Sequence, residues 1–216
     1  MQTKAVVFDL DGTLLDTLAD LADACNYTRA QLGLPTMEKD WYRLKLGNGA
    51  KKLVQRFLPA EMQTGAAFEN AYAVYCGYYE THTSQKTEPF YEITELLAAL
   101  RANGVKLGVV SNKPDGATQA VIAHYFPHVF DAVAGKKDGY GVKPDPAGLL
   151  ACMQALGTTQ TNTVYVGDSD VDVYAAHNAH IPCAAAAWGY RGEQELAAAG
   201  ADFMLNSPLQ LLEYLQ

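Results

Sequence analysis

Positive charge is scarce in this sequence, and so are long apolar runs. Its 216 residues include 16 lysines and arginines against 24 aspartates and glutamates, a formal net charge of −8. Nucleic acids and anionic membranes attract clustered positive charge, so we expect no nucleic-acid partner and no membrane partner. No apolar run approaches the roughly 20 residues that span a bilayer. The first residues run into an apolar strand without a basic leader. These absences together predict a cytoplasmic protein.

Cysteine is also sparse, with four residues in the chain. Cys25, Cys76, Cys152 and Cys183 stand far apart and contain no CxxC pair, so we expect neither a zinc site nor a disulfide framework. They are typical of small buried side chains in a reducing compartment. The remaining composition, 49% hydrophobic and 19% charged, is ordinary for a globular protein of this length.

The periodicity of apolar residues divides the chain into two kinds of segment. Residues 5–8 are apolar and predict a buried strand, whereas residues 16–84 show helical spacing throughout. From residue 85 onward, helical patterns alternate with short buried strands, which predicts right-handed crossovers and a parallel sheet. We therefore expect an α/β fold: a doubly wound, Rossmann-like core from residues 1–15 and 85–216, with a helical cap domain of residues 16–84 inserted after the first strand.

Polar residues gather where the predicted strands end. In an open parallel sheet, ligands bind beyond the carboxyl ends of the strands, so these residues are expected to meet at one edge. Each has a simpler reading alone: the aspartates as turn or helix caps, the serine as a turn hydroxyl, the lysine as a surface charge. Their joint position favours a functional site. The residues are Asp9 and Asp11; Ser111, Asn112 and Lys113; Lys143; and Asp168, Asp170 and Asp172.

A hard cation would explain why two aspartates stand so close. Asp9 and Asp11 are two residues apart at a strand end, so both side chains point the same way, and like charges about 4 Å apart repel by roughly 1 kcal/mol in water and about 4 kcal/mol near a protein surface. Mg²⁺ prefers such oxygen ligands and is usually held together with a substrate phosphate. We expect carboxylates of Asp9 and Asp168 and the Asp11 carbonyl to bind it.

Phosphoryl transfer would use the same residues. The free oxygen of Asp9 would attack phosphorus to give an aspartyl-phosphate, and Asp11 would act as acid and then as base. Ser111 and Lys143 would hold the phosphate oxygens.

Four motifs in order resemble the haloacid dehalogenase superfamily of phosphotransferases. They are "DLDGT", Ser111, Lys143 and "GDSDVD", and the helical segment 16–84 is similar to that superfamily's cap. The resemblance implies Asp9 as nucleophile, Asp11 as acid/base, and Thr13 as a phosphate ligand beside Ser111 and Asn112. It further implies Lys143 as the charge stabiliser, Asp168 as a Mg²⁺ ligand, and Asp172 as a residue that orients metal-bound water or the lysine.

Within the superfamily, "WGYRG" and "LGNGAKKLV" resemble the phosphoglycolate phosphatase group. The resemblance implies a small phosphorylated metabolite as substrate, with phosphoglycolate the first choice, and a monomer or homodimer. A glycine-rich cap loop, Gly47, Asn48 and Gly49, and also Arg191 are candidates for contact with the non-reacting end of the substrate. The loop is equally consistent with a tight turn between cap helices.

Other functions fit the same core. A phosphosugar mutase of the β-phosphoglucomutase type resembles the chain in fold, although such mutases often have valine where Thr13 stands. An inorganic pyrophosphatase on this core is a further alternative. A dehalogenase typically lacks the second aspartate of the signature, which is Asp11 here. A receiver module that is not an enzyme carries its acceptor aspartate on a middle strand and has no inserted cap.

Overall fold

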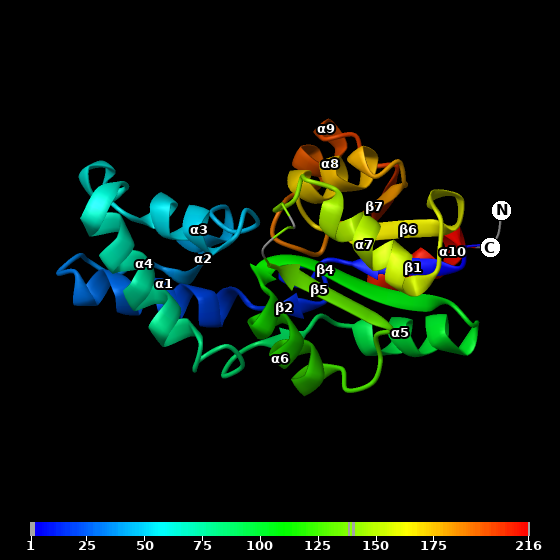
Figure 1. The fold of residues 1–216 in the computed structure, drawn as a ribbon, viewed down its shortest axis with the longest axis horizontal. Helices are drawn as coiled ribbons and strands as arrows, with labels where there is room; N and C mark the ends of the chain where they lie inside the picture. Colours follow the sequence, from blue (N-terminus) through cyan, green and yellow to red (C-terminus); the bar gives the residue numbers. More distant parts are fainter. Residues whose placement is uncertain (1–2, 138, 140, 216) are drawn as a thin grey trace.

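The computed structural model describes residues 3–137, 139 and 141–215. Its centre is a six-stranded sheet in the order β5-β4-β1-β6-β7-β8, in which every pairing between neighbours is parallel. Helices cover both faces (Figure 1), so the predicted doubly wound α/β fold is confirmed. The strands are β1 (Ala5–Phe8), β4 (Lys106–Pro114), β5 (Ala132–Lys136), β6 (Thr163–Gly167), β7 (Cys183–Ala186) and β8 (Phe203–Leu205).

Strand β1 is buried on both faces because it lies in the middle of the sheet. Val6 and Phe8 pack with helices on one side, and Ala5 and Val7 pack with helices on the other. This alternation follows from the two-residue period of a strand. In a parallel sheet the carboxyl ends of β4, β1 and β6 reach the same edge, so the residues that follow β1 and β6 lie close together.

Two helical layers sandwich the sheet. Helices α5, α6 and α10 supply side chains to one apolar core, and α7, α8 and α9 supply the other. Short 3₁₀ turns η2 (Gln160–Asn162) and η3 (Pro208–Gln210) complete the connections. The helices are α5 (Ile93–Ala102), α6 (Asp115–Tyr125), α7 (Ala147–Leu156), α8 (Asp170–Asn178), α9 (Glu193–Ala198) and α10 (Leu211–Tyr214). Within the part of the chain that the structure describes, no helix combines the length and apolar character needed to cross a bilayer.

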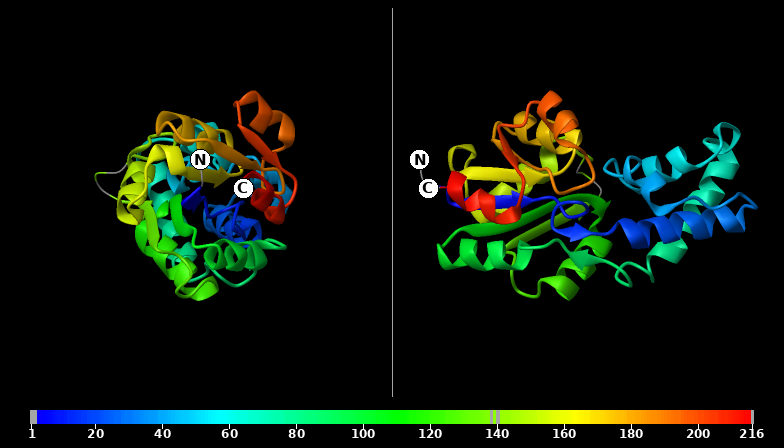
Figure 2. Two further views of the ribbon diagram at one scale, coloured as in Figure 1. Left: turned by 90° about the vertical axis from the view of Figure 1, so that its right-hand side faces the viewer. Right: turned by 180° about the vertical axis from the view of Figure 1, so that it is seen from behind.

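The remaining helices project from the carboxyl edge of the sheet (Figure 2). They pack around an apolar core of their own, built from leucines and aromatic side chains such as Tyr42, Phe57 and Tyr75. We call this helical segment the cap; its boundaries at residues 16–84 and its standing as a separate domain stay predictions. Its elements are α1 (Leu18–Gln31), α2 (Lys39–Arg43), α3 (Ala50–Phe57), η1 (Ala60–Met62) and α4 (Gly65–Tyr79).

The chain enters and leaves the cap through a short antiparallel ribbon. Strand β2 (Leu15–Asp16) pairs with β3 (Glu88–Pro89). Beside this ribbon the buried carboxylate of Asp20 accepts hydrogen bonds from the backbone amides of Gln85, Lys86 and Thr87, and from the Thr87 hydroxyl at 2.7 Å. One carboxylate therefore fastens the first cap helix to the returning chain.

Replacing Asp20 by asparagine is expected to destabilise the protein by about 1–3 kcal/mol. The asparagine amide group would face backbone donors that need an acceptor, and buried unsatisfied donors cost that much. Urea denaturation measures the difference in the free energy of unfolding. Asp23→Asn is the matched control on the same helix, because the Asp23–Lys86 pair is exposed and such pairs contribute at most about 1 kcal/mol. Equal destabilisation by both variants would contradict the assignment.

Strand β4 runs further than the sequence pattern indicates. The apolar run of residues 105–111 predicts a strand that ends at Ser111, but the strand continues to Pro114, after a register shift against β5 between Val110 and Pro114. Ser111 and Asn112 therefore lie within a strand and not in the loop after it. The prediction of the element type was right and its end was wrong, because pairing with β5 extends the strand past the polar residues.

Candidate active site

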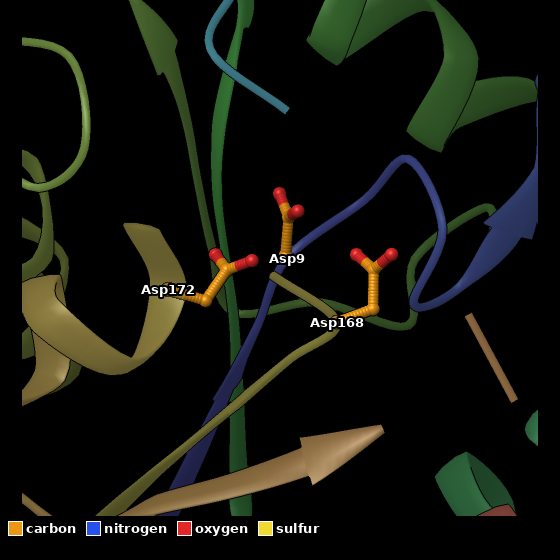
Figure 3. Close-up of side chains that lie close together, drawn as sticks. All are labelled: Asp9, Asp168 and Asp172. Atoms are coloured by element: carbon orange, nitrogen blue, oxygen red, sulfur yellow. The ribbon is translucent and has the colours of Figure 1, made fainter. Parts of the chain in front are cut away.

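Three buried aspartates meet at the carboxyl edge of the sheet. Asp9 directly follows β1, Asp168 directly follows β6, and Asp172 lies in the first turn of α8. Their carboxylate groups approach one another in Figure 3, and one oxygen from each lies within 4.8 Å of the others. All three side chains are buried. The sequence placed Asp9 and Asp168 in one cluster and Asp172 just outside it; the structure brings all three together.

Lys143 is the cation of this cluster. Its buried Nζ lies 2.7 Å from Asp9 Oδ1 and 2.6 Å from Asp172 Oδ1, and it donates a hydrogen bond to the Tyr165 hydroxyl at 3.1 Å. The loop that carries Lys143 is held by Asn112, whose Oδ1 accepts from the Lys143 amide at 2.7 Å. Although Lys143 lies in a loop, this hydrogen bond holds it beside the two carboxylates.

The charges in the cluster do not balance. Burial raises the pKa of Asp168 well above its ordinary value, and the charges of Asp172 and Asp9 raise it further. Burial likewise raises the pKa of Asp9, against the opposing effect of Lys143. For Lys143, burial lowers the pKa, but the charges of Asp172 and Asp9 outweigh it and the pKa is raised. Three carboxylates around one ammonium leave an excess of negative charge that a bound cation would relieve.

Asp172 is occupied on both of its oxygens. Its Oδ1 faces Lys143 and accepts a hydrogen bond from the Tyr165 hydroxyl at 3.0 Å, while Oδ2 accepts from the amide and hydroxyl of Ser169. The Ser169 contacts form a capping box at the start of α8. Its carboxylate is therefore better placed to orient Lys143 than to bind an ion directly.

Two glycines allow the backbone to pack closely against Asp168. A Cβ atom added to Gly12, whose φ is +92°, would lie 2.4 Å from Asp168 Oδ2, and one added to Gly189 would lie 2.3 Å from Asp168 Cβ. The two oxygens of Asp168 accept hydrogen bonds from the Tyr190 amide at 2.7 Å and from the Thr13 hydroxyl at 3.3 Å. The glycines of "DGT" and "WGY" are thus needed for close approach to this carboxylate.

The expected phosphate ligands occupy different positions. Thr13 is buried and its hydroxyl donates to Asp168. The Ser111 hydroxyl lies at the cavity beside Asp9 and accepts a hydrogen bond from the Lys113 amide at 3.2 Å. The side-chain amide of Asn112 donates to the carbonyls of Gly47 at 3.0 Å and Lys143 at 3.3 Å. Their roles toward phosphate stay predictions.

Lys113 was expected at the end of its strand, but the sequence predicted no role for it. Its buried Nζ donates to both carboxylate oxygens of Asp11, at 2.8 and 2.9 Å, and to the hydroxyl of Tyr79 in cap helix α4 at 2.7 Å. Burial lowers the pKa of Lys113, but the charge of Asp11 prevails and the pKa is raised. A signal was available: Lys113 follows Ser111 by two residues, so both point to the same face of a strand.

The cap loop 47–49 reaches the core. Gly47 and Gly49 line the cavity described below, whereas Asn48 faces away and accepts a hydrogen bond from Arg56. The guanidinium of Arg191 donates to the carbonyls of Leu44 at 3.1 Å and Leu46 at 3.0 Å. Arg191 therefore joins the core to the cap and does not line the cavity. Contact of these residues with a substrate stays a prediction.

A cavity of about 440 Å³ lies between the cap and the core and ends at the acidic cluster. Asp9, Asp11, Ser111 and Lys143 line its inner end. Cap helices α1, α3 and α4, core helix α6, the end of β4 and the cap loop supply most of the rest of its wall. The cavity therefore connects the strand ends with a space large enough for a small ligand.

The sequence model of one protein family, the haloacid dehalogenase-like hydrolases, matches residues 6–186. The chain belongs to this family. The resemblance inferred from the four motifs is thereby confirmed, and so is the expectation of an enzyme similar to phosphoglycolate phosphatases.

Relatives of this hydrolase match it over nearly its whole length. The phosphoglycolate phosphatase of Chromobacterium violaceum is 34% identical over 99% of this chain and 96% of its own. A candidate phosphoglycolate phosphatase from Lactobacillus delbrueckii subsp. bulgaricus, known from a crystal structure, is 33% identical with a TM-score of 0.94 over 100% of this chain and 99% of its own. CbbY from Rhodobacter sphaeroides, crystallised with phosphate, is 26% identical with a TM-score of 0.80 over 98% and 96%.

Proposed function

We propose that this hydrolase cleaves phosphomonoesters of small metabolites and that Asp9 carries the phosphoryl group as an aspartyl-phosphate. One observation carries the proposal: the Asp9 carboxylate lies at the inner end of the cavity, 2.7 Å from Lys143 Nζ and close to Asp168. A carboxylate held in a buried, cation-bearing pocket is suited to attack on phosphorus. The phosphate in the CbbY crystal supports phosphate chemistry on this fold.

Mg²⁺ is the proposed cofactor, and the residues present fit it. The donors are all carboxylate or carbonyl oxygens, and their excess negative charge is buried. Asp9, Asp168 and the Asp11 carbonyl would hold the ion, with Asp172 acting through Lys143. When bound, Mg²⁺ would neutralise charge and polarise the phosphoryl group of the substrate.

The chain's own residues divide the reaction into two steps. The Asp9 carboxylate attacks phosphorus and the bond to the alcohol oxygen breaks, while Asp11, protonated at this step, gives that oxygen its proton. Asp11 then takes a proton from water, which attacks the phosphorus of the aspartyl-phosphate and releases phosphate. Lys143 and Ser111 stabilise the negative charge on the transferring phosphoryl oxygens. Lys113 holds the Asp11 carboxylate in place through both oxygens.

Phosphate release from a panel of phosphate compounds tests the proposal. We expect release that depends on Mg²⁺ and stops with EDTA, and 2-phosphoglycolate is the first compound to test because relatives carry its name. Pyrophosphate and β-glucose 1-phosphate belong in the same panel. Cleavage of pyrophosphate alone would indicate a pyrophosphatase. Conversion of β-glucose 1-phosphate that needs a bisphosphate, without phosphate release from any compound, would replace hydrolysis by a mutase reaction.

A further inference from the structure

Away from the acidic cluster, the cavity wall is apolar. We call this outer part the chamber. Its lining comes from both the cap and the core, and its polar side chains are few. The apolar lining consists of Leu21, Leu46, Ala50, Leu53 and Tyr75 of the cap, and Ala117 and Ala120 of α6. Whatever group the substrate carries beyond its phosphate would contact these side chains.

The cations that line the cavity are already paired. Lys143 lies between Asp9 and Asp172, and Lys113 is bound on Asp11. Among the residues that the structure describes, no other lysine or arginine lines the cavity. The five residues outside the described part of the chain include neither lysine nor arginine. A second negative charge on the substrate would therefore find no counter-ion in the chamber.

The cap has other cations, but they point elsewhere. Lys51 and Lys52 line a neighbouring depression of about 140 Å³, which shares Gly49 and Ala50 with the cavity, but neither lysine lines the cavity itself. Arg56 donates to the Lys45 carbonyl at 2.9 Å and to Asn48. Arg191 donates to two cap carbonyls. These four side chains lie outside the chamber lining and contact other groups of the protein: the Gln55 side chain for Lys52, the Tyr72 ring for Lys51 and Glu195 for Arg191 are among them.

The chamber also carries a negative charge of its own. Glu80, which follows α4, is exposed and lines the cavity. A carboxylate in the substrate would lose hydration against leucine and tyrosine side chains and would face Glu80. An uncharged apolar group would gain from the same surfaces. The chamber thus discriminates by charge.

We propose that the alcohol released by this enzyme is uncharged and largely apolar, and that it occupies the chamber. This inference rests on the proposed phosphomonoester hydrolysis and narrows its substrate class. It sets the chain apart from an enzyme built for a carboxylate-bearing substrate such as phosphoglycolate. Each methylene group that enters the chamber is expected to raise kcat/KM about fourfold.

Two substrates that share the benzyl group and differ in charge test the charge preference. Benzyl phosphate and 4-carboxybenzyl phosphate differ by one carboxylate and release similar alcohols, so chemistry at phosphorus is matched. With Mg²⁺ present, we expect kcat/KM for benzyl phosphate to exceed that for 4-carboxybenzyl phosphate by at least about tenfold, mainly through KM. Benzyl phosphate is also expected to exceed 2-phosphoglycolate. An equal or reversed order would overturn the inference and leave phosphomonoester hydrolysis standing.

A charge introduced into the chamber tests the location. Ala120 is exposed on α6 and lines the chamber, so Ala120→Lys places an ammonium there at little cost to the helix. The preference for benzyl phosphate is expected to fall about tenfold or to reverse. Gln119→Lys is the control, because it adds the same charge at the neighbouring exposed position, outside the cavity lining.

The outcomes separate the two proposals. An unchanged preference in Ala120→Lys would place the alcohol elsewhere and overturn the inference. An equal change in Gln119→Lys would assign the effect to overall charge and overturn it as well. Absence of phosphate release from every compound would instead refute the proposed hydrolysis, on which the inference depends.

Discussion

Asp9→Asn is expected to reduce phosphate release by a factor on the order of 10⁴ or more, with the fold retained. An amide oxygen is a poor nucleophile toward phosphorus, and the two carboxylates clustered with Asp9 are engaged elsewhere: Asp172 accepts hydrogen bonds on both oxygens, and so does Asp168. Steady-state phosphate release with Mg²⁺ measures the loss. Residual activity within about tenfold of the unaltered enzyme would rule out the covalent route.

The fold of this variant can be tested separately. Burial raises the pKa of Asp9, so ionisation of Asp9 weakens the metal-free fold as the pH rises above the ordinary carboxyl pKa of about 3.9. The neutral asparagine does not ionise, and the thermal midpoint at pH 7 without metal is expected to be unchanged or higher. Asp170→Asn is the matched control for activity, because this half-buried aspartate begins α8 and lies outside the cluster. The Asp170→Asn variant should keep most of the turnover.

Lys143→Met is expected to have the second-largest effect, and it acts on both stability and activity. The substitution leaves Asp9 and Asp172 buried without their counter-ion, and breaking a buried pair by removing one partner costs about 3–5 kcal/mol. Activity should also collapse, because the group that stabilises charge on the phosphoryl oxygens is gone. Urea denaturation and phosphate release measure the two effects.

A second variant separates the two effects of Lys143. In Lys143→Met with Asp172→Asn, one of the two uncompensated charges is removed, so part of the lost stability should return. Turnover should stay low because the Lys143 ammonium no longer faces Asp9. Recovery of turnover together with stability would show that Lys143 acts only by maintaining the fold.

Most of the fold could be predicted from periodicity. The strands predicted after residue 85 are short apolar runs separated by helices, and the structure places each of them in the parallel sheet. What could not be predicted depends on pairing partners. The end of β4 is set by its contact with β5, and the ribbon of β2 and β3 joins residues more than 70 positions apart that carry no apolar pattern of their own.

The residues of the candidate site also fall into those that the sequence predicts and those that it does not. Asp9, Asp168 and Lys143 follow from motifs at strand ends, and the structure brings their side chains together. Lys113 was missed because its role depends on Asp11 and on Tyr79 from the cap, two contacts between distant parts of the chain. Arg191 lies near the site in the sequence pattern, yet its guanidinium is directed to the carbonyls of Leu44 and Leu46. Side-chain direction after a strand is set by tertiary packing.

The ribbon between β2 and β3 bears on how such an enzyme can change over evolution. Because Leu15 pairs with Pro89, the chain departs from the core and returns to it at one place. A segment bounded in this way can lengthen, shorten or be exchanged at small cost, since closing a longer loop adds only about 0.6 kcal/mol per doubling of its length. Asp9, Asp168 and Lys143 lie outside it. The chemistry can thus be inherited unchanged while the surface that selects the substrate diverges.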